Sequence, residues 1–367
     1  MIYYLIDGLA QKYPDLNALT YLSSRIILAL LTSIFLSMFI YPRFIGLLKN
    51  FNVKQPLRKL GLQKEEEKNS TPTMGGTVIV FTTLISAFLW MDFINPHFVT
   101  VLIVTLAFWG VGFLDDFLKI SKKNPDGLSG RLKLLLLTFF AIIAVVWHAW
   151  SQNEFYPMHS QKFLYSITIP FLKGISFHIG YVYLFFAVLV IVGSSNAVNL
   201  TDGLDGLAIG PVITCCLALL ILSYVTGNAV VAKYLYYYTV PGSGELCIFL
   251  SALIGASVGF LWFNTFPAQI FMGDSGSLAL GGILGTVSII THHEILLIIL
   301  GGIFVIETLS VIIQVISFKM TGHRVFRMAP LHHHYQKKGW VEQKIVVRVW
   351  IISFMLALVS ILTLKLR

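Results

Sequence analysis

The chain has 367 residues, of which 56% are hydrophobic and only 12% are charged, and its mean hydropathy is +0.80. A soluble domain carries about twice that charged fraction, so the composition excludes an ordinary soluble protein and predicts one that crosses a membrane several times. The net charge of +9 does not indicate a nucleic-acid partner, because the basic residues follow the pattern of membrane topology.

Apolar segments long enough to cross a bilayer follow one another along the chain. About 20 residues of helix span the hydrocarbon layer, and ten segments approach that length. The eighth is short and rich in glycine, and the polar sequence Thr291-His292-His293-Glu294 separates it from the ninth. The sequence therefore predicts an all-α polytopic membrane protein with a single integral membrane domain over residues 1–367. The predicted spans are roughly 22–42, 75–94, 98–118, 132–150, 179–198, 207–226, 247–264, 276–290, 295–318 and 344–365.

The basic residues predict the orientation of these spans. Loops 43–74, 119–133 and 319–344 contain 7, 5 and 6 of the 26 Lys and Arg residues. Since short cytoplasmic loops carry the positive excess, these three loops are expected to face the cytoplasm and both termini to face the periplasm.

Aspartates lie at the ends of several apolar segments, where a carboxylate is costly and usually marks an ion or substrate site. Two predicted spans separate each acidic cluster from the next, and an even number of crossings returns the chain to the same side of the membrane. The sequence therefore predicts a single site on the cytoplasmic face. The five aspartates are Asp115, Asp116, Asp202, Asp205 and Asp274.

Asp115 and Asp116 are neighbours on a helix, so their side chains point about 100° apart and are expected to have different roles. One could bind a metal ion while the other faces a substrate phosphate or Lys119, one turn further on. The alternative is a helix end charged only for solvation. An acidic pair near a helix C-terminus opposes the helix dipole, which favours a function.

Two glycine-rich segments carry the other acids. Residues 199–206 read N-L-T-D-G-L-D-G and alternate oxygen ligands with glycines, without the later carboxylates of an EF-hand; an ordinary turn is the alternative. Residues 271–277 read F-M-G-D-S-G-S and begin the eighth span. Asp274 and Ser275 suit an N-cap, and the free amides of such a terminus also bind phosphate. Asn264, at the end of the preceding span, could present its amide to the same pocket.

Basic and polar residues could surround an anionic substrate. His332, His333 and His334 lie in the third basic loop and lack the i, i+4 spacing of a helical zinc site. They could neutralise phosphate or transfer a proton near neutral pH, and a loop triplet without function is the alternative. Further candidates, each with a structural alternative such as capping, snorkelling or packing, are Lys68, Thr73, Lys133, Glu307 and Gln314.

These residue types point to one reaction class. Hard oxygen ligands favour Mg²⁺ over zinc, and lysines and histidines neutralise phosphate. Phosphoryl transfer depends on positioning and charge neutralisation of this kind. A site at the membrane surface further predicts one soluble and one lipid-borne substrate.

Six motifs along the chain resemble, in their sequence and order, those of the phospho-N-acetylmuramoyl-pentapeptide-transferase family, which belongs to the polyprenyl-phosphate sugar-phosphate transferases. The resemblance covers nearly the whole chain, and the intact histidine triplet favours this branch. The motifs are T-P-T-M-G-G (71–76), D-D-F-L-K (115–119), N-A-V-N-L-T-D-G-L-D-G (196–206), F-P-A-Q-I-F-M-G-D-S-G-S-L-A-L-G-G (266–282), A-P-L-H-H-H-Y (329–335) and K-I-V-V-R-V-W-I-I-S (344–353).

The resemblance implies a Mg²⁺-dependent homodimeric enzyme with ten spans in the bacterial cytoplasmic (inner) membrane. Its expected reaction moves phospho-MurNAc-pentapeptide from UDP-MurNAc-pentapeptide onto undecaprenyl phosphate, a membrane lipid, and gives lipid I and UMP. Asp274 matches the metal ligand, and Asp116 is the better candidate base of the acidic pair. The implied catalytic residues are Asp115, Asp116, Asp274 and His332. The implied substrate-binding residues are Lys68, Thr73, Lys119, Lys133, Asn199, Asp202, Asp205, Asn264, Phe271, Gln314, His333 and His334.

One departure and two alternatives accompany this interpretation. The family commonly has Phe-Glu after the histidine triplet, whereas this chain has Tyr335-Gln336, which is expected to change local pairing but not to abolish activity. A transferase that uses UDP-GlcNAc is the nearer alternative. A secondary transporter is the more distant one, because transporters place their polar residues near the bilayer midplane.

Overall fold

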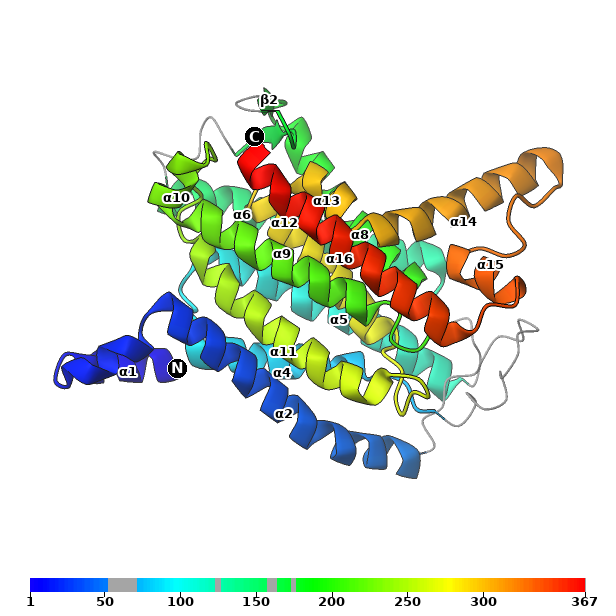
Figure 1. Ribbon diagram of the computed structural model, residues 1–367, viewed down its shortest axis with the longest axis horizontal. Helices are drawn as coiled ribbons and strands as arrows, with labels where there is room; N and C mark the ends of the chain where they lie inside the picture. Colours follow the sequence, from blue (N-terminus) through cyan, green and yellow to red (C-terminus); the bar gives the residue numbers. More distant parts are fainter. Residues whose placement is uncertain (52–70, 123–126, 157–163, 173–175, 367) are drawn as a thin grey trace.

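The apolar segments form the helical bundle of Figure 1, a computed structural model that describes residues 1–51, 71–122, 127–156, 164–172 and 176–366. Each of the ten predicted spans has a helical counterpart in this part of the chain. The long helices are α2 (Leu22–Asn50), α4 (Gly76–Trp90), α5 (Pro96–Ser121), α6 (Gly130–Phe155), α8 (Val182–Thr201), α9 (Ile209–Gly227), α11 (Leu246–Asn264), α12 (Asp274–Ile290), α14 (Gly302–Thr321) and α16 (Glu342–Leu366).

Smaller elements connect these helices. The strands pair antiparallel, with Ile167 opposite Phe177. Apart from α13, which lies in the predicted span 295–318, the sequence analysis predicted none of these smaller elements. They are α1 (Ile2–Ala10), η1 (Pro14–Leu19), β1 (Ser166–Thr168), β2 (Ser176–His178), α10 (Ala229–Tyr234), η2 (Ser243–Glu245), α13 (Glu294–Leu300) and α15 (Leu331–Lys337).

Eight helices within the described residues are long and apolar enough to cross a membrane. The other two predicted spans are the shorter helices α4 and α12, with 15 and 17 residues. At 1.5 Å per residue, α12 is only about 25 Å long. Every residue of α12 from Ser275 to Ile290 is buried by neighbouring helices, so this helix lies inside the protein.

Burial separates the centre of the bundle from its periphery. In the most apolar stretch of α11, 78% of the residues are buried, whereas only 22% are buried in the corresponding stretches of α2 and α14. Exposed aliphatic and aromatic side chains such as Phe35 on α2 and Ile316 on α14 form the outer surface. A surface of this kind is stable against lipid, so α11 and α12 form the core while the peripheral helices offer a lipid-facing exterior.

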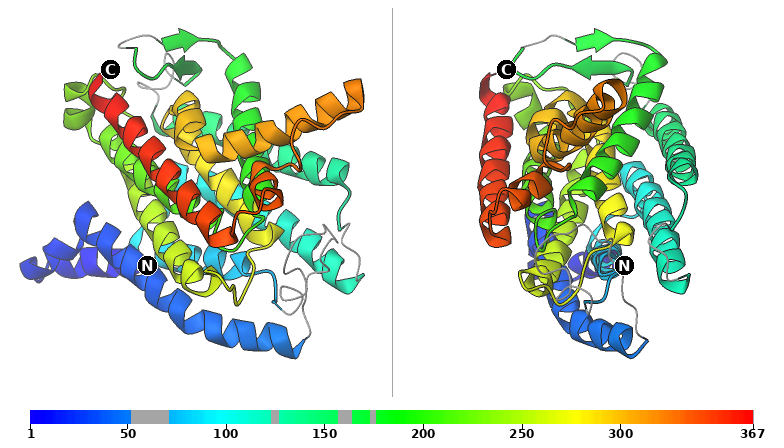
Figure 2. Two further views of the ribbon diagram at one scale, coloured as in Figure 1. Left: turned by 45° about the vertical axis from the view of Figure 1, so that its right-hand side comes forward. Right: turned by 90° about the vertical axis from the view of Figure 1, so that its right-hand side faces the viewer.

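The ninth predicted span, 295–318, is wrong as a continuous helix. It consists of α13 and α14, which are separated at Gly301. After this break α14 runs outward from the bundle, as Figures 1 and 2 show. Glycine lacks a side chain that would favour helix continuation, so it accommodates the change of direction.

Candidate active site

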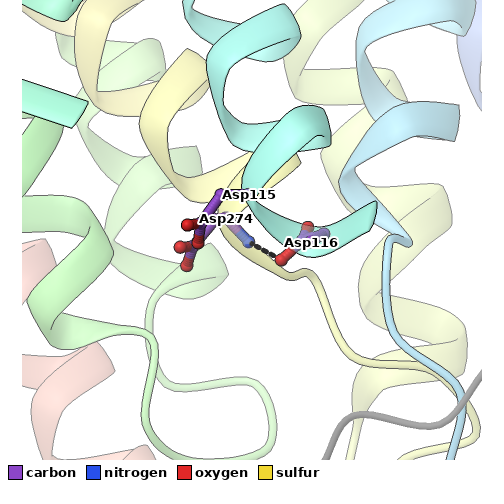
Figure 3. A group of neighbouring side chains, drawn as sticks. All are labelled: Asp115, Asp116 and Asp274. Atoms are coloured by element: carbon purple, nitrogen blue, oxygen red, sulfur yellow. Dashed lines mark hydrogen bonds between the residues drawn. The ribbon is translucent and has the colours of Figure 1, made fainter. Parts of the chain in front are cut away.

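Three carboxylates meet where α5 ends and α12 begins. Asp115 and Asp116 come from α5 and Asp274 is the first residue of α12, and one oxygen from each lies within 4.8 Å of the others. Figure 3 shows Asp115 beside Asp274, with Asp116 on the other side of the start of α12. The expected convergence of distant acidic motifs is therefore confirmed for these residues.

Asp116 closes the N-terminus of α12. Its two carboxylate oxygens accept hydrogen bonds from the backbone nitrogens of Asp274 and Ser275, at 3.1 and 3.0 Å. Capping, the alternative to a functional role for Asp274 and Ser275, is not observed, because Gly273 occupies the N-cap position and Asp274 is already helical. A carboxylate satisfies unpaired amides at a helix N-terminus and is favoured there by the helix dipole.

Two lysines converge on the other acids. Lys119 Nζ lies 2.6 Å from Asp115 Oδ2 and 2.9 Å from Asp274 Oδ2. Lys133 Nζ lies 2.6 Å from the same Asp274 oxygen. The backbone nitrogen of Leu128 donates to Asp115 Oδ1 at 2.7 Å. The adjacent carboxylates of α5 thus face different partners, as their expected 100° separation predicts.

Asn199 connects α8 to the same cluster. Its Nδ2 donates to Asp274 Oδ1 at 2.7 Å and to Ser277 Oγ at 2.8 Å. Both oxygens of Asp274 are therefore engaged, one by lysines and one by an amide. Ser277 was not among the predicted site residues, although it belongs to the same F-M-G-D-S-G-S segment.

Close backbone packing fixes the position of Asp274. A Cβ atom placed on Gly112 of α5 would lie 2.2 Å from the carbonyl oxygen of Asp274. Real Cβ atoms do not approach a backbone oxygen so closely, so only glycine allows α5 and α12 to meet at this point. By contrast, a Cβ on Gly110 would have no atom within 4 Å apart from the backbone of its own helix and the residues next to it in the chain.

The segment after α8 is held by residues that the resemblance assigned to the substrate pocket. Asn264 accepts from the backbone nitrogen of Gly206 at 2.9 Å and donates to the Ile270 carbonyl at 2.8 Å. Asp205 Oδ2 accepts from the nitrogen of Ala268 at 3.1 Å. These contacts join the 199–206 segment to the loop that leads into α12.

Asp202 belongs to this segment, and the charges of Asp274, Asp116 and Asp205 act on it. It is partly buried. Burial raises the pKa of Asp202 to about 8, and the negative charges of neighbouring carboxylates, chiefly Asp274 and Asp116, add to that effect. At neutral pH Asp202 is therefore mainly protonated and can donate a hydrogen bond as well as accept one.

The histidine triplet lies on a short helix, α15, so its prediction as a loop is wrong. His332 is 1% exposed, and its Nδ1 lies 3.2 Å from Glu307 Oε2 on α14. His333 Nδ1 lies 2.7 Å from the Gln336 side-chain oxygen. Gln336 therefore still offers an acceptor where the family commonly has Glu. His334 Nδ1 accepts from the backbone nitrogen of Arg327 at 3.0 Å.

The remaining predicted residues differ in their surroundings. Thr73 is buried, and its Oγ1 would lie 2.9 Å from a Cβ on Gly273, close to Asp116. Phe271 exchanges backbone hydrogen bonds with residues 72 and 75. Gln314 uses both ends of its amide on the backbone of Phe326, which supports the packing alternative. Lys68 lies outside the described residues.

An apolar cavity of about 280 Å³ lies between α8 and the α13–α14 pair. The side of α8 that lines it includes Phe186, Val190, Ser194 and Ala197, positions that share one helical face. The lining on α8 extends to Val198, which directly precedes Asn199 in the chain.

The donor set fits a Mg²⁺ ion. Three carboxylates at close range supply the hard oxygen ligands that Mg²⁺ prefers. Only two lysines, Lys119 and Lys133, pair with these three acids in the described residues, which leaves one excess negative charge. A cation or the protonation of one acid would balance it.

Comparisons with known proteins agree with this arrangement. The glycosyl transferase family 4 model matches residues 98–292, which include the acidic pair, Asn199 and Asp274. A phospho-N-acetylmuramoyl-pentapeptide-transferase from Granulibacter bethesdensis is 48% identical over 369 aligned residues, covering 100% of each chain. The chain therefore belongs to the phospho-N-acetylmuramoyl-pentapeptide-transferase family, within glycosyl transferase family 4.

Proposed function

We propose that this protein transfers phospho-MurNAc-pentapeptide from UDP-MurNAc-pentapeptide to undecaprenyl phosphate and releases lipid I and UMP. The observation that carries this proposal is the convergence of acids and lysines from α5, α6 and α12, together with Asn199 from α8, which also lines an apolar cavity. Full-length similarity to a protein of that name supports the substrate pair. The UDP-GlcNAc alternative has no comparable support.

The apolar cavity is the proposed site for the start of the polyprenyl chain. It is lined by α8, α13 and α14, and its lining on α8 ends at Val198, the residue before Asn199, which contacts Asp274. We place the hydrocarbon in this cavity with its phosphate toward Asn199, Lys119 and Lys133. Since apolar chains gain free energy by leaving water, such a groove selects a lipid-borne acceptor over a soluble one.

The lysines and the start of α12 are proposed to bind and orient the phosphates. Lys119 and Lys133 would exchange part of their contact with Asp274 for contact with phosphate oxygens, and so hold the two reacting groups together. Bound Mg²⁺, held by Asp274 with Asp115 and Asp116 nearby, would neutralise charge on the diphosphate.

A direct attack of the acceptor phosphate on the β-phosphate of the donor agrees best with this geometry. A phosphate monoester has a second pKa near 6, so at neutral pH it is mostly a dianion and needs no strong base. Both oxygens of Asp116 accept backbone hydrogen bonds, which supports a role in holding α12 over the role of base. Asp115 and Asp274 are likewise engaged at both oxygens.

The membrane arrangement completes the proposal. The protein is proposed to be a single integral membrane transferase domain in the bacterial inner membrane, a homodimer, with its site on the cytoplasmic face and both termini in the periplasm. The basic loops of the sequence support this orientation. In Figure 1, α2 and α16 run in opposite directions, so their ends nearest the termini lie at one end of the bundle, away from the acidic cluster.

The decisive experiment compares two donors on the purified protein with undecaprenyl phosphate. UDP-MurNAc-pentapeptide is expected to give lipid I and UMP, with activity lost in EDTA and restored by Mg²⁺. Transfer from UDP-GlcNAc alone would establish the other branch, and no transfer from either donor would contradict the proposal. Incubation with donor alone tests the route: a phosphorylated aspartate would contradict direct attack and establish a two-step reaction.

A further inference from the structure

Glu307 is a buried glutamate that the sequence offered as a candidate and that the family resemblance did not assign to the site. It lies on α14, is 5% exposed, and contacts the first histidine of the triplet on α15. Its Oε2 lies 3.2 Å from His332 Nδ1 and also accepts from the backbone nitrogen of His332 at 3.3 Å. One carboxylate oxygen thus holds both the ring and the backbone of the same histidine.

This contact determines which ring nitrogen is available. An ionised carboxylate can only accept hydrogen bonds, so the proton of a neutral His332 ring resides on Nδ1. Nε2 then carries the lone pair, and in the protonated ring it carries the second N–H. Within the described residues Nε2 is buried and has no hydrogen-bond partner. A buried polar atom of this kind usually has a ligand or water as its partner.

The free nitrogen lies against the segment that follows α8. A Cβ atom on Gly203 would lie 2.3 Å from His332 Nε2, so any other residue there would displace the ring. Gly203 follows Asp202 in the chain, and the negative charges of Asp274 and Asp116 act on the Asp202 carboxyl group. His332 is therefore aimed at the substrate side of the bundle and away from α14.

Titratable groups approach the ring from α14 and α15, and further acids lie in the segment that Gly203 belongs to. Glu307 comes from α14, His333 comes from α15 with ring centroids 4.2 Å apart, and Asp202 and Asp205 belong to the segment of Gly203. Glu342 accepts from the backbone nitrogen of Asp205 at 2.9 Å and adds a further acid near this segment. Only His333 among these groups adds positive charge, and only when it is protonated.

We propose that Glu307 is a positioning residue: it fixes the proton of His332 on Nδ1 and directs Nε2–H of the imidazolium toward a phosphate oxygen of the bound diphosphate. The inference rests on the proposed transferase function. It explains why a glutamate is present at a buried position where a glutamine would fill the same volume. A buried carboxylate is costly unless it is paired, and here its partner is the imidazolium.

The test replaces Glu307 with Gln and uses Ser310→Ala as the matched control. Glutamine keeps the size and an acceptor oxygen but removes the charge. Ser310 is buried one turn further along α14, and its hydroxyl donates to the Glu307 carbonyl at 2.6 Å. For Glu307→Gln we expect kcat to fall about 10- to 100-fold, the range found when a partner that orients a histidine ligand of a metal is removed. The KM for UDP-MurNAc-pentapeptide should change little.

The pH profile separates positioning from a merely structural role. Loss of an opposite charge lowers the pKa of an imidazolium, so the high-pH limb of kcat should move down by about one unit or more in Glu307→Gln. Ser310→Ala should keep the wild-type profile. An unchanged profile in Glu307→Gln, or a kcat equal to that of Ser310→Ala, would overturn the proposal.

A double variant and a binding measurement complete the test. If Glu307 acts through His332, then Glu307→Gln should cause no further loss of kcat in a His332→Asn background, whereas multiplicative losses would overturn the proposal. Retained UMP binding and a wild-type melting profile identify variants that are folded. Absence of transfer in the wild type would count against the proposed function itself, and not against the link between Glu307 and His332.

Discussion

Two buried groups of charged residues, at opposite ends of the bundle, differ in how their charges balance. Away from the site, Arg25 on α2 and Glu245 beside α11 form a bidentate ion pair with nitrogen–oxygen distances of 2.9 and 2.7 Å. Glu245 also accepts from the backbone nitrogen of Asp92 at 3.0 Å. One cation thus meets one anion, in a geometry that satisfies both.

The acidic cluster at the other end is not balanced in this way. Three carboxylates, Asp115, Asp116 and Asp274, face Lys119 and Lys133 in the described part of the chain. The comparison teaches that burial of charge does not by itself identify a site. A matched pair is complete as a structural contact, whereas surplus negative charge at close range requires a cation or a proton.

The largest expected effect comes from Asp274→Asn. Asparagine has nearly the same shape but removes the charge that both lysines share, so kcat should fall at least about 100-fold, as for the loss of a major electrostatic group in other active sites. A transfer assay at saturating Mg²⁺ measures this loss, and the melting temperature in detergent shows whether the fold is retained. Near-normal turnover would remove Asp274 from the metal and phosphate site.

Gly112→Ala tests whether the site depends on the close approach of α5 and α12. The added Cβ would lie 2.2 Å from the Asp274 carbonyl oxygen, so one helix must shift. A displacement approaching 1 Å at reacting groups can reduce the rate about 100-fold, and we expect a loss of kcat of about 10- to 100-fold. Gly110→Ala, on the same helix with open space at its Cβ, should retain wild-type activity. Equal effects of the two variants would contradict this interpretation.

Arg25→Met should affect stability instead of chemistry. Removing one partner of a buried pair leaves Glu245 unpaired, which costs about 3 kcal/mol. The melting temperature should therefore fall while kcat, measured well below the transition, stays at the wild-type value. A strong loss of kcat in the folded variant would show that the two ends of the bundle are coupled.

The smallest effect is a change in how stability depends on pH. The pKa of Asp202 is about 8 in the folded protein and close to 4 in an unfolded chain. The unfolded state therefore loses this proton first, and the stabilising contribution of protonated Asp202 declines as the pH rises from about 4 to 8. Asp202→Asn should make the melting temperature fall less steeply between pH 5 and pH 8, and an identical slope would contradict a raised pKa.

The sequence by itself determined the apolar spans and the convergence of the acidic motifs. Hydropathy along a helix is a local property, and counting crossings places distant segments at the same end of a bundle without knowledge of how the helices pack. The contacts at Asp274 agree with the counting of crossings. Residues from three other helices meet it there, namely Asp115, Asp116, Lys133 and Asn199. The small glycine-rich segment before α12 was also identified from its residues alone.

Only the tertiary structure decided which side chains pair across helices. Asp116 closes the terminus of α12, Glu307 contacts His332, and Gln314 binds the backbone of Phe326 because of the relative rotation and height of packed helices. The break at Gly301 and the helical form of the histidine triplet likewise depend on neighbours far along the chain. Burial makes each such pairing specific, because an unpaired polar group inside the protein is costly, and no one-dimensional pattern records the geometry that satisfies it.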